Sequence, residues 1–305
     1  MKRFSLLVFL FTLVLSSFSQ GVFNEIYTGD TSFYNLPLNG LAVDYQNSIY
    51  GVYLEVNGGY RGYVIKKYSA NGVELASYKR PSSSLLFSGS SRPILFHNSK
   101  NQLLHGYSYS NDSLICIERL NQELELVSDN CFNCGAESRF YSMELLSDSL
   151  LFVTCTAKEE FSPVDSDAYL MLLNIETNEI VWKRNLGVEN LSENIPGVAV
   201  YQDRALIAYR DEGFNMHALI YHKQGFPMAE KVFPELNTIH WTKNQKNGND
   251  IYAIANIGSI FTDDGVTVLR LNSVNLTIED SATYLAEKRA YAGNSYFHNG
   301  FLYTH

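Results

Sequence analysis

The sequence predicts an all-β fold built from repeated four-stranded antiparallel sheets. Val, Ile, Leu, Tyr and Phe dominate its short apolar runs, while Asn, Gly, Asp and Ser fill the bends between them. No stretch carries a sustained helical period with capping residues. Most decisively, a polar residue precedes a short apolar strand about every 50 residues. These residues are Asn47, Asn101, Asp148, Asp203, Asn249 and Asn299. Such units are typical of the blades of a β-propeller. A β-sandwich is the alternative, but it would give irregular connections.

Each of the first five units continues with a second strand, a polar turn and a further strand. In the first unit, NSIYGVYLEV is followed by YVIKKYSANG (63–72) and VELASYK, and an apolar run (LAVDYQ) comes before it. We therefore expect four strands in each blade. The complete blades are predicted at about 40–80, 92–129, 140–187, 196–234 and 238–284, and a partial sixth at about 290–305.

The partial sixth blade leaves two possibilities open. Residues 23–29 (FNEIYTG) could supply an outer strand that closes the ring and removes an open sheet edge. Alternatively, the sequence is truncated at His305 and the native protein continues, an expectation that we favour.

Two segments resemble known propeller repeats. IETNEIVWKRNLG (175–187) resembles the outer-strand turn of quinoprotein-like and WD40-like repeats, with an acidic-Thr turn and a Trp a few residues later. NSIYGVYLEVNG and YVIKKYSANGVEL, within 47–75, resemble the repeats of secreted bacterial propellers. The resemblance covers most of residues 40–300. It implies the architecture and no particular activity, because propellers host unrelated functions.

The N-terminal segment predicts export. Two basic residues (Lys2 and Arg3), a short apolar stretch (4–15) and small residues before Gln20 are typical of a secretory signal peptide over residues 1–19. A membrane anchor is the alternative, but no later apolar stretch approaches the ~20 residues needed to span a bilayer. We expect residues 20–305 to form the propeller in an oxidising compartment, which means the periplasm, the cell surface or the extracellular space.

Charge and motifs exclude several function classes. The chain has 32 acidic against 23 basic residues and a net charge of −9, so it lacks the basic surface that nucleic-acid binding requires. The sequence contains no HExxH, GxSxG, P-loop or GxGxxG motif. It therefore predicts no zinc protease, nucleophile elbow, P-loop or dinucleotide site.

The four cysteines suggest local cross-linking. Cys131 and Cys134 form a CxxC sequence between the second and third blades, and we expect a structural disulfide between them. Unpaired or differently paired thiols, and redox or metal chemistry, remain alternatives. Cys116 and Cys155 lie in separate strands, where we expect small apolar side chains.

Acidic residues gather in the predicted connections between the second and third strands of the blades. These connections emerge on one face of a propeller, so their acids could converge there and hold calcium. The candidate ligands are Asp165, Asp167, Asp211, Asp263 and Asp264. A solvated acidic face is the alternative, and we expect it more strongly. Apart from calcium, no cofactor is predicted.

These observations favour a non-enzymatic role. We expect a secreted or cell-surface propeller that serves as a scaffold and binds a protein or glycan at its loop rim. The alternative is a propeller enzyme, either a quinoprotein-like oxidoreductase or a calcium-dependent hydrolase, that uses the acidic loops.

Overall fold

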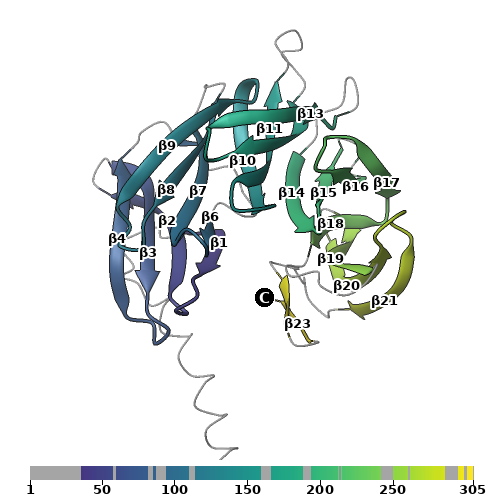
Figure 1. The fold of residues 1–305 in the computed structure, drawn as a ribbon. Coiled ribbons are helices and arrows are strands. Elements are labelled where there is room, and N and C mark those ends of the chain that lie inside the picture. Colours follow the sequence, from purple (N-terminus) through teal and green to yellow (C-terminus); the bar gives the residue numbers. More distant parts are fainter. Residues whose placement is uncertain are drawn as a thin grey trace, which may run out of the picture.

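The computed structural model describes residues 36–57, 60–81, 85–86, 94–109, 114–158, 166–187, 194–211, 213, 215–241, 250–259, 262–285, 295–298 and 301–304. All regular elements in these ranges are β-strands, and they form successive antiparallel sheets (Figure 1). The predicted all-β propeller, with five complete blades and a partial sixth, is confirmed.

The strands of the five blades have the following bounds. The first blade holds β1 (Leu36–Val43), β2 (Ile49–Asn57), β3 (Tyr60–Tyr68) and β4 (Glu74–Pro81), and the second holds β5 (Leu85–Leu86), β6 (Ile94–His97), β7 (Gln102–Tyr109), β8 (Leu114–Leu120) and β9 (Leu126–Asn133). The third holds β10 (Ala136–Leu145), β11 (Leu150–Lys158), β12 (Ser166–Asn174) and β13 (Glu179–Asn185), and the fourth holds β14 (Asn194–Tyr201), β15 (Arg204–Arg210), β16 (Met216–His222) and β17 (Pro227–Phe233). The fifth holds β18 (Leu236–Trp241), β19 (Asp250–Ser259), β20 (Thr262–Asn272) and β21 (Ile278–Leu285), and β22 (Ser295–His298) pairs with β23 (Phe301–Thr304) in the partial sixth.

The core of the molecule lies between neighbouring blades. Side chains alternate between the two faces of a strand, so a blade can bury both of its faces. On β11, Phe152 packs toward the fourth blade, whereas its neighbour Val153 packs toward the second. The first strands of the blades lie innermost in the ring, and the fourth strands lie outermost (Figure 1).

The innermost strands are irregular in every complete blade. The pairing register shifts within β1, β10, β14 and β18. In the second blade the inner position is divided between β5 and β6, which both pair with β7. Such bulges bend a strand and increase its twist, which suits strands that crowd around a common centre.

The recurring polar residue before the second strand has a backbone explanation. Asn47 and Asn101 have φ angles of 63° and 52°, in the left-handed region that Asn tolerates better than most residues. In the first blade, Asp44 Oδ1 also accepts hydrogen bonds from the backbone N–H groups of Gln46 and Ser48, at 2.9 and 2.8 Å. The repeat residue thus takes the left-handed turn position in the first two blades, while in the fourth blade Gln202, next to Asp203, takes it with a φ angle of 56°.

The turns that join the third and fourth strands are called outer turns below. They span residues 69–73, 121–125, 175–178, 223–226 and 273–277. Gly72 and Gly225 take the left-handed position in two of them, with φ angles of 80° and 84°. Leu124 and Leu276 take a left-handed position in two others, with φ angles of 62° and 58°, and both side chains are buried. Burial of these leucines offsets a conformation that is unfavourable for a bulky residue.

The predicted disulfide between Cys131 and Cys134 is wrong. Cys131 pairs with Cys116, and Cys134 pairs with Cys155, so Cys116 and Cys155 are not free apolar residues. β9 is extended as far as Asn133, and residues three apart along an extended chain are about 10 Å apart and point to opposite faces. A disulfide needs Cα atoms within about 7 Å, so the CxxC cysteines could not pair with each other.

Several sequence predictions concern residues outside the described ranges. The predicted signal peptide (1–19), the possible closing strand (23–29) and Asp165 are among them. Within the ranges above, the structure contains no helix that is long and apolar enough to cross a membrane.

Candidate functional site

The structure describes four of the five acidic residues that the sequence predicts as calcium ligands. Asp263 and Asp264 lie within β20 itself rather than in a loop, and Asp263 pairs with Gly258 of β19. Asp167 is buried and accepts a hydrogen bond from Asn185 Nδ2 at 2.7 Å, within its own blade. Across the described ranges, no three His, Cys, Asp or Glu side chains are grouped so that they could hold a metal ion. The calcium site stays a prediction.

Asp211 is also held by its own blade. Its Oδ1 accepts the backbone N–H of Asn215 at 2.8 Å, and its Oδ2 lies 3.1 Å from Nε2 of His217. Burial alone would raise the pKa of Asp211, but the hydrogen bonds from Asn215 and His217 outweigh it and lower the pKa. The ring of Tyr209 stacks on His217, with centroids 4.8 Å apart. These contacts fix the turn between β15 and β16.

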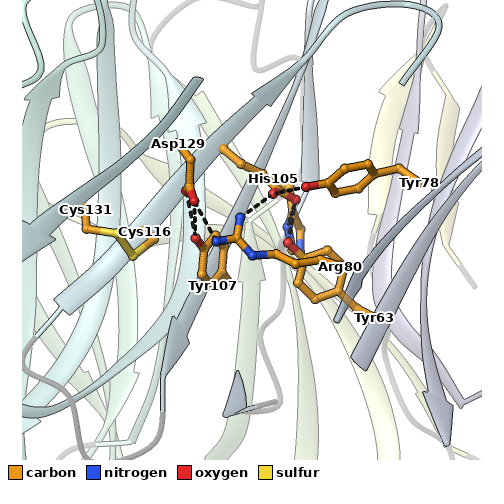
Figure 2. Close-up of polar contacts among 9 residues, drawn as sticks. Tyr63, Tyr78, Arg80, His105, Tyr107, Cys116, Asp129 and Cys131 are labelled. Atoms are coloured by element: carbon orange, nitrogen blue, oxygen red, sulfur yellow. Dashed lines mark hydrogen bonds and ion pairs between the residues drawn. A yellow bond between two sulfur atoms is a disulfide. The ribbon is translucent and has the colours of Figure 1, made fainter. Parts of the chain in front are cut away.

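A larger polar cluster lies between the first and second blades. We call it the interblade cluster, and Figure 2 shows it together with a neighbouring disulfide. It consists of Tyr63, Tyr78 and Arg80 from the first blade and His105, Tyr107, Glu118 and Asp129 from the second.

Glu118 is the centre of this cluster and is fully buried. Its Oε1 accepts a hydrogen bond from the Tyr63 hydroxyl at 2.6 Å and lies 2.9 Å from His105 Nδ1. Its Oε2 accepts hydrogen bonds from Arg80 Nη1 at 2.9 Å and from the Tyr78 hydroxyl at 3.2 Å. A buried carboxylate is costly unless its oxygens are satisfied, and here both oxygens have two partners.

Arg80 joins the two carboxylates of the cluster. Its Nη2 lies 2.6 Å from Asp129 Oδ2, while its Nη1 binds Glu118, so the planar guanidinium bridges both acids. Glu118 and Asp129 are directly opposite each other on β8 and β9, where like charges destabilise strand pairing. Arg80 also lies over the ring of Tyr107, 4.6 Å from its centroid, and Tyr107 donates a hydrogen bond to Asp129. The guanidinium from the first blade thus offsets the repulsion between two carboxylates in the second blade.

The electrostatics of the cluster favour ionised Glu118 beside neutral tyrosines. Burial alone would raise the pKa of Glu118, but His105, Tyr63 and Arg80 outweigh it and hold the pKa below its ordinary value. Burial and the Glu118 charge raise the pKa of Tyr78 to about 12 and that of Tyr63 further. Glu118, His105 and Tyr63 are nearly inaccessible to solvent, so the cluster is built to hold two blades together rather than to receive a substrate.

Sequence reasoning missed this cluster, although one signal was present. Glu118 stands in LICIERL, where a single acid interrupts an apolar strand. An acid in such a strand is rarely buried unless it is paired. Its partners come from β3, β4 and β7, and one strand cannot reveal them.

The outer turns form a second set of contacts between blades. In each case a side chain of the earlier blade reaches the outer turn of the next. Lys67 Nζ donates to the carbonyl of Gln122 at 3.1 Å, and Arg119 Nη1 lies 3.8 Å from the Glu176 carboxylate. Further along, Arg184 Nε donates to the carbonyl of Gly225 at 2.8 Å, and Arg204 Nη1 donates to that of Ser273 at 3.1 Å.

Exposed apolar side chains also recur around the outer turns. Each complete blade has two such residues in or just after its outer turn, and together we call them the outer band. They are Val73, Leu75, Leu126, Val127, Ile180, Val181, Phe226, Met228, Val274 and Ile278. Single exposed apolar residues are common on protein surfaces, but repetition around the outer turn of every complete blade places these along one edge of the ring.

The fold and these contacts define the chain as a β-propeller. Among solved structures, it is similar to a neuraminidase-like protein of A/little yellow-shouldered bat/Guatemala, with 11% identity over 86% of this chain and 87% of that chain and a TM-score of 0.51. It is also similar to the β-propeller domain of the Trilobed protease from Pyrococcus furiosus, with 9% identity, coverage of 91% and 78%, and a TM-score of 0.52. A Pyrococcus horikoshii acylaminoacyl peptidase matches with 8% identity over 90% of this chain and 42% of that chain, with a TM-score of 0.54.

Sequence comparison adds no family. No protein-family model matches the chain, and no curated protein matches it. Identities near 10% show a shared fold alone.

Proposed function

We propose that this protein is a secreted or cell-surface propeller that binds a partner as a rigid platform and catalyses no reaction. The outer band carries the proposal, because exposed apolar side chains that recur along one edge are typical of interaction surfaces. Nine of its ten members are aliphatic or Met, which favours a protein partner over a glycan, whose sugar rings stack on aromatic side chains.

Rigidity between blades supports the same role. The interblade cluster and the contacts to the outer turns hold neighbouring blades in fixed positions, so the outer band keeps its spacing without a ligand. A platform that is already ordered loses little conformational entropy when it binds. The two disulfides suit an oxidising compartment, as secretion requires.

Site-specific photo-cross-linking tests the proposal. The full chain would carry a photoreactive side chain at Val127 or Val181 in the outer band, and would be expressed in the cells that produce it. A matched control would carry the same group at Glu137, which is exposed beyond the opposite end of β9. We expect a discrete cross-linked protein from the two band positions and none from Glu137.

Substitution of the band completes the test. The variants Val127→Ser and Val181→Ser should abolish the cross-link formed from the other band position, while far-ultraviolet circular dichroism stays unchanged. If these variants lose binding to an immobilised glycan instead, the partner is a glycan. If the variants lose neither the cross-link nor glycan binding, the outer band is not a binding surface and the proposal fails.

A further inference from the structure

The two disulfides differ in their access to solvent. Cys134 and Cys155 are both fully buried, in the core between the second and third blades. Cys116 is fully buried as well, but its partner Cys131 is exposed on β9, the outermost strand of the second blade. Of the two disulfides, Cys116–Cys131 is therefore the one that a thiol can approach without opening the core.

The direction of the exposed bond also favours attack. Cys116 and Cys131 are directly opposite each other on β8 and β9, with Cα atoms 4.0 Å apart. The bond therefore runs from the inner strand of this pair toward the outer edge of the blade. Thiol–disulfide exchange requires the incoming sulfur to approach in line with the bond that breaks. At Cys131 that approach comes from beyond the outermost strand, whereas at Cys116 the core blocks it.

The disulfide is also adjacent to the interblade cluster. Glu118 is two residues from Cys116 along β8, and Asp129 is two residues from Cys131 along β9, so each acid shares a strand face with a cysteine. The disulfide holds together the strand pair on which these like charges face each other. Its loss would remove this covalent link, and the contacts of Asp129 with Arg80 and Tyr107 would then have to oppose the repulsion between the two acids without it.

We propose that the Cys116–Cys131 disulfide is a thiol-exchange site for a dithiol reductant of the CxxC class, attacked at Cys131, and that its reduction loosens β9 from the interblade cluster. This goes beyond the proposed binding function and does not depend on it.

The exchange proceeds in two balanced steps. A thiolate of the reductant attacks Sγ of Cys131 and forms a mixed disulfide, while the Cys116–Cys131 bond breaks and its electron pair leaves on Sγ of Cys116, which takes a proton from water. The second thiolate of the reductant then attacks the reductant's own sulfur in the mixed disulfide and releases Cys131, which is protonated in turn. Two electrons pass from the reductant to Cys116 and Cys131, the two thiols take their protons from water, and the reductant leaves as a disulfide.

Reduction of the native protein tests the site directly. The folded full chain would be treated with low-millimolar dithiothreitol without denaturant, and samples would be alkylated over time and mapped as peptides. We expect Cys116 and Cys131 to be alkylated at least about tenfold faster than Cys134 and Cys155, which serve as the internal control. Equal rates, faster reduction of Cys134–Cys155, or reduction only after denaturation would each overturn the proposal.

A trapping experiment identifies the attacked sulfur and the consequence. A thioredoxin whose resolving cysteine is replaced by serine should form a mixed disulfide with Cys131, and a link to Cys116 would refute the assigned direction. Hydrogen exchange should then show several-fold faster exchange in β9 after mild reduction, with β13 of the third blade unchanged. Unchanged exchange in β9 would refute the loosening. A variant with both Cys134→Ala and Cys155→Ala should still form the mixed disulfide at Cys131 and still show faster exchange in β9 after reduction. If this variant fails to fold, the alkylation rates of the wild-type protein decide whether Cys116–Cys131 is the exchange site.

Discussion

Replacing Arg80 by methionine removes the one cation that bridges Glu118 and Asp129, and keeps most of the apolar length of the side chain. The Arg80 side chain is 17% exposed, Glu118 is fully buried and Asp129 is 23% exposed. Removing one partner of a buried ion pair costs about 3–5 kcal/mol, because the other charge stays buried without compensation. Since Asp129 is partly solvated, we expect the lower end, about 3 kcal/mol of unfolding free energy.

Urea unfolding followed by tyrosine fluorescence measures this loss. The matched control is Lys66→Met, which removes an exposed ion pair to Glu74 with a similar distance of 2.8 Å. Exposed pairs contribute about 0–1 kcal/mol, so the control should change little. A further variant that combines Arg80→Met with Glu118→Gln should recover part of the loss, because it removes the uncompensated charge. Equal costs for Arg80→Met and Lys66→Met, or no recovery in the combined variant, would refute the reasoning.

Three further predictions follow from single positions. The pKa of Glu118 lies below its ordinary value of 4.5, so its ionised form contributes stability that is complete above pH 4.5 and is lost as pH falls through the folded-state pKa. In urea titrations below pH 4.5, the unfolding free energy of Glu118→Gln should therefore fall less steeply with pH than that of the wild-type protein. Leu124→Gly relieves about 1 kcal/mol of left-handed strain but removes a buried leucine worth about 3 kcal/mol, so urea unfolding should show a net loss of about 2 kcal/mol, and a gain would contradict the assigned burial. Gly106→Ala would place a methyl group inside the ring of Phe140, so we expect a lower melting temperature and a loss of about 1–3 kcal/mol of unfolding free energy. An unchanged melting temperature would disprove this close approach.

The blades could be predicted from the sequence because their turns leave a local signature. Asn47 and Asn101 mark left-handed turn positions, and such positions restrict residue type at one point of the chain. Alternating apolar strands between these marks then give the repeat. Irregularities such as the division of the inner strand into β5 and β6 leave no comparable mark, since they depend on how the strands crowd around the centre.

The disulfides and the interblade cluster required long-range information. Cys116 and Cys131 lie opposite each other because the pairing of β8 and β9 shifts by one residue at Arg119 and Leu120, so the outer turn at 121–125 alone does not indicate the pair. The prediction of a bond between Cys131 and Cys134 rests on their closeness in sequence, and it is wrong for that reason. Glu118 meets Tyr63 and Arg80 only through the packing of two sheets, which no local pattern encodes.

The contacts to the outer turns have a direction that bears on how the chain assembles. Lys67, Arg119, Arg184 and Arg204 each belong to an earlier blade and bind the outer turn of the blade that follows it. A chain that leaves the ribosome from its N-terminus therefore completes the donor before the acceptor is made. Each new blade meets a surface that already carries the side chain it needs, and the order of synthesis is also the order of docking.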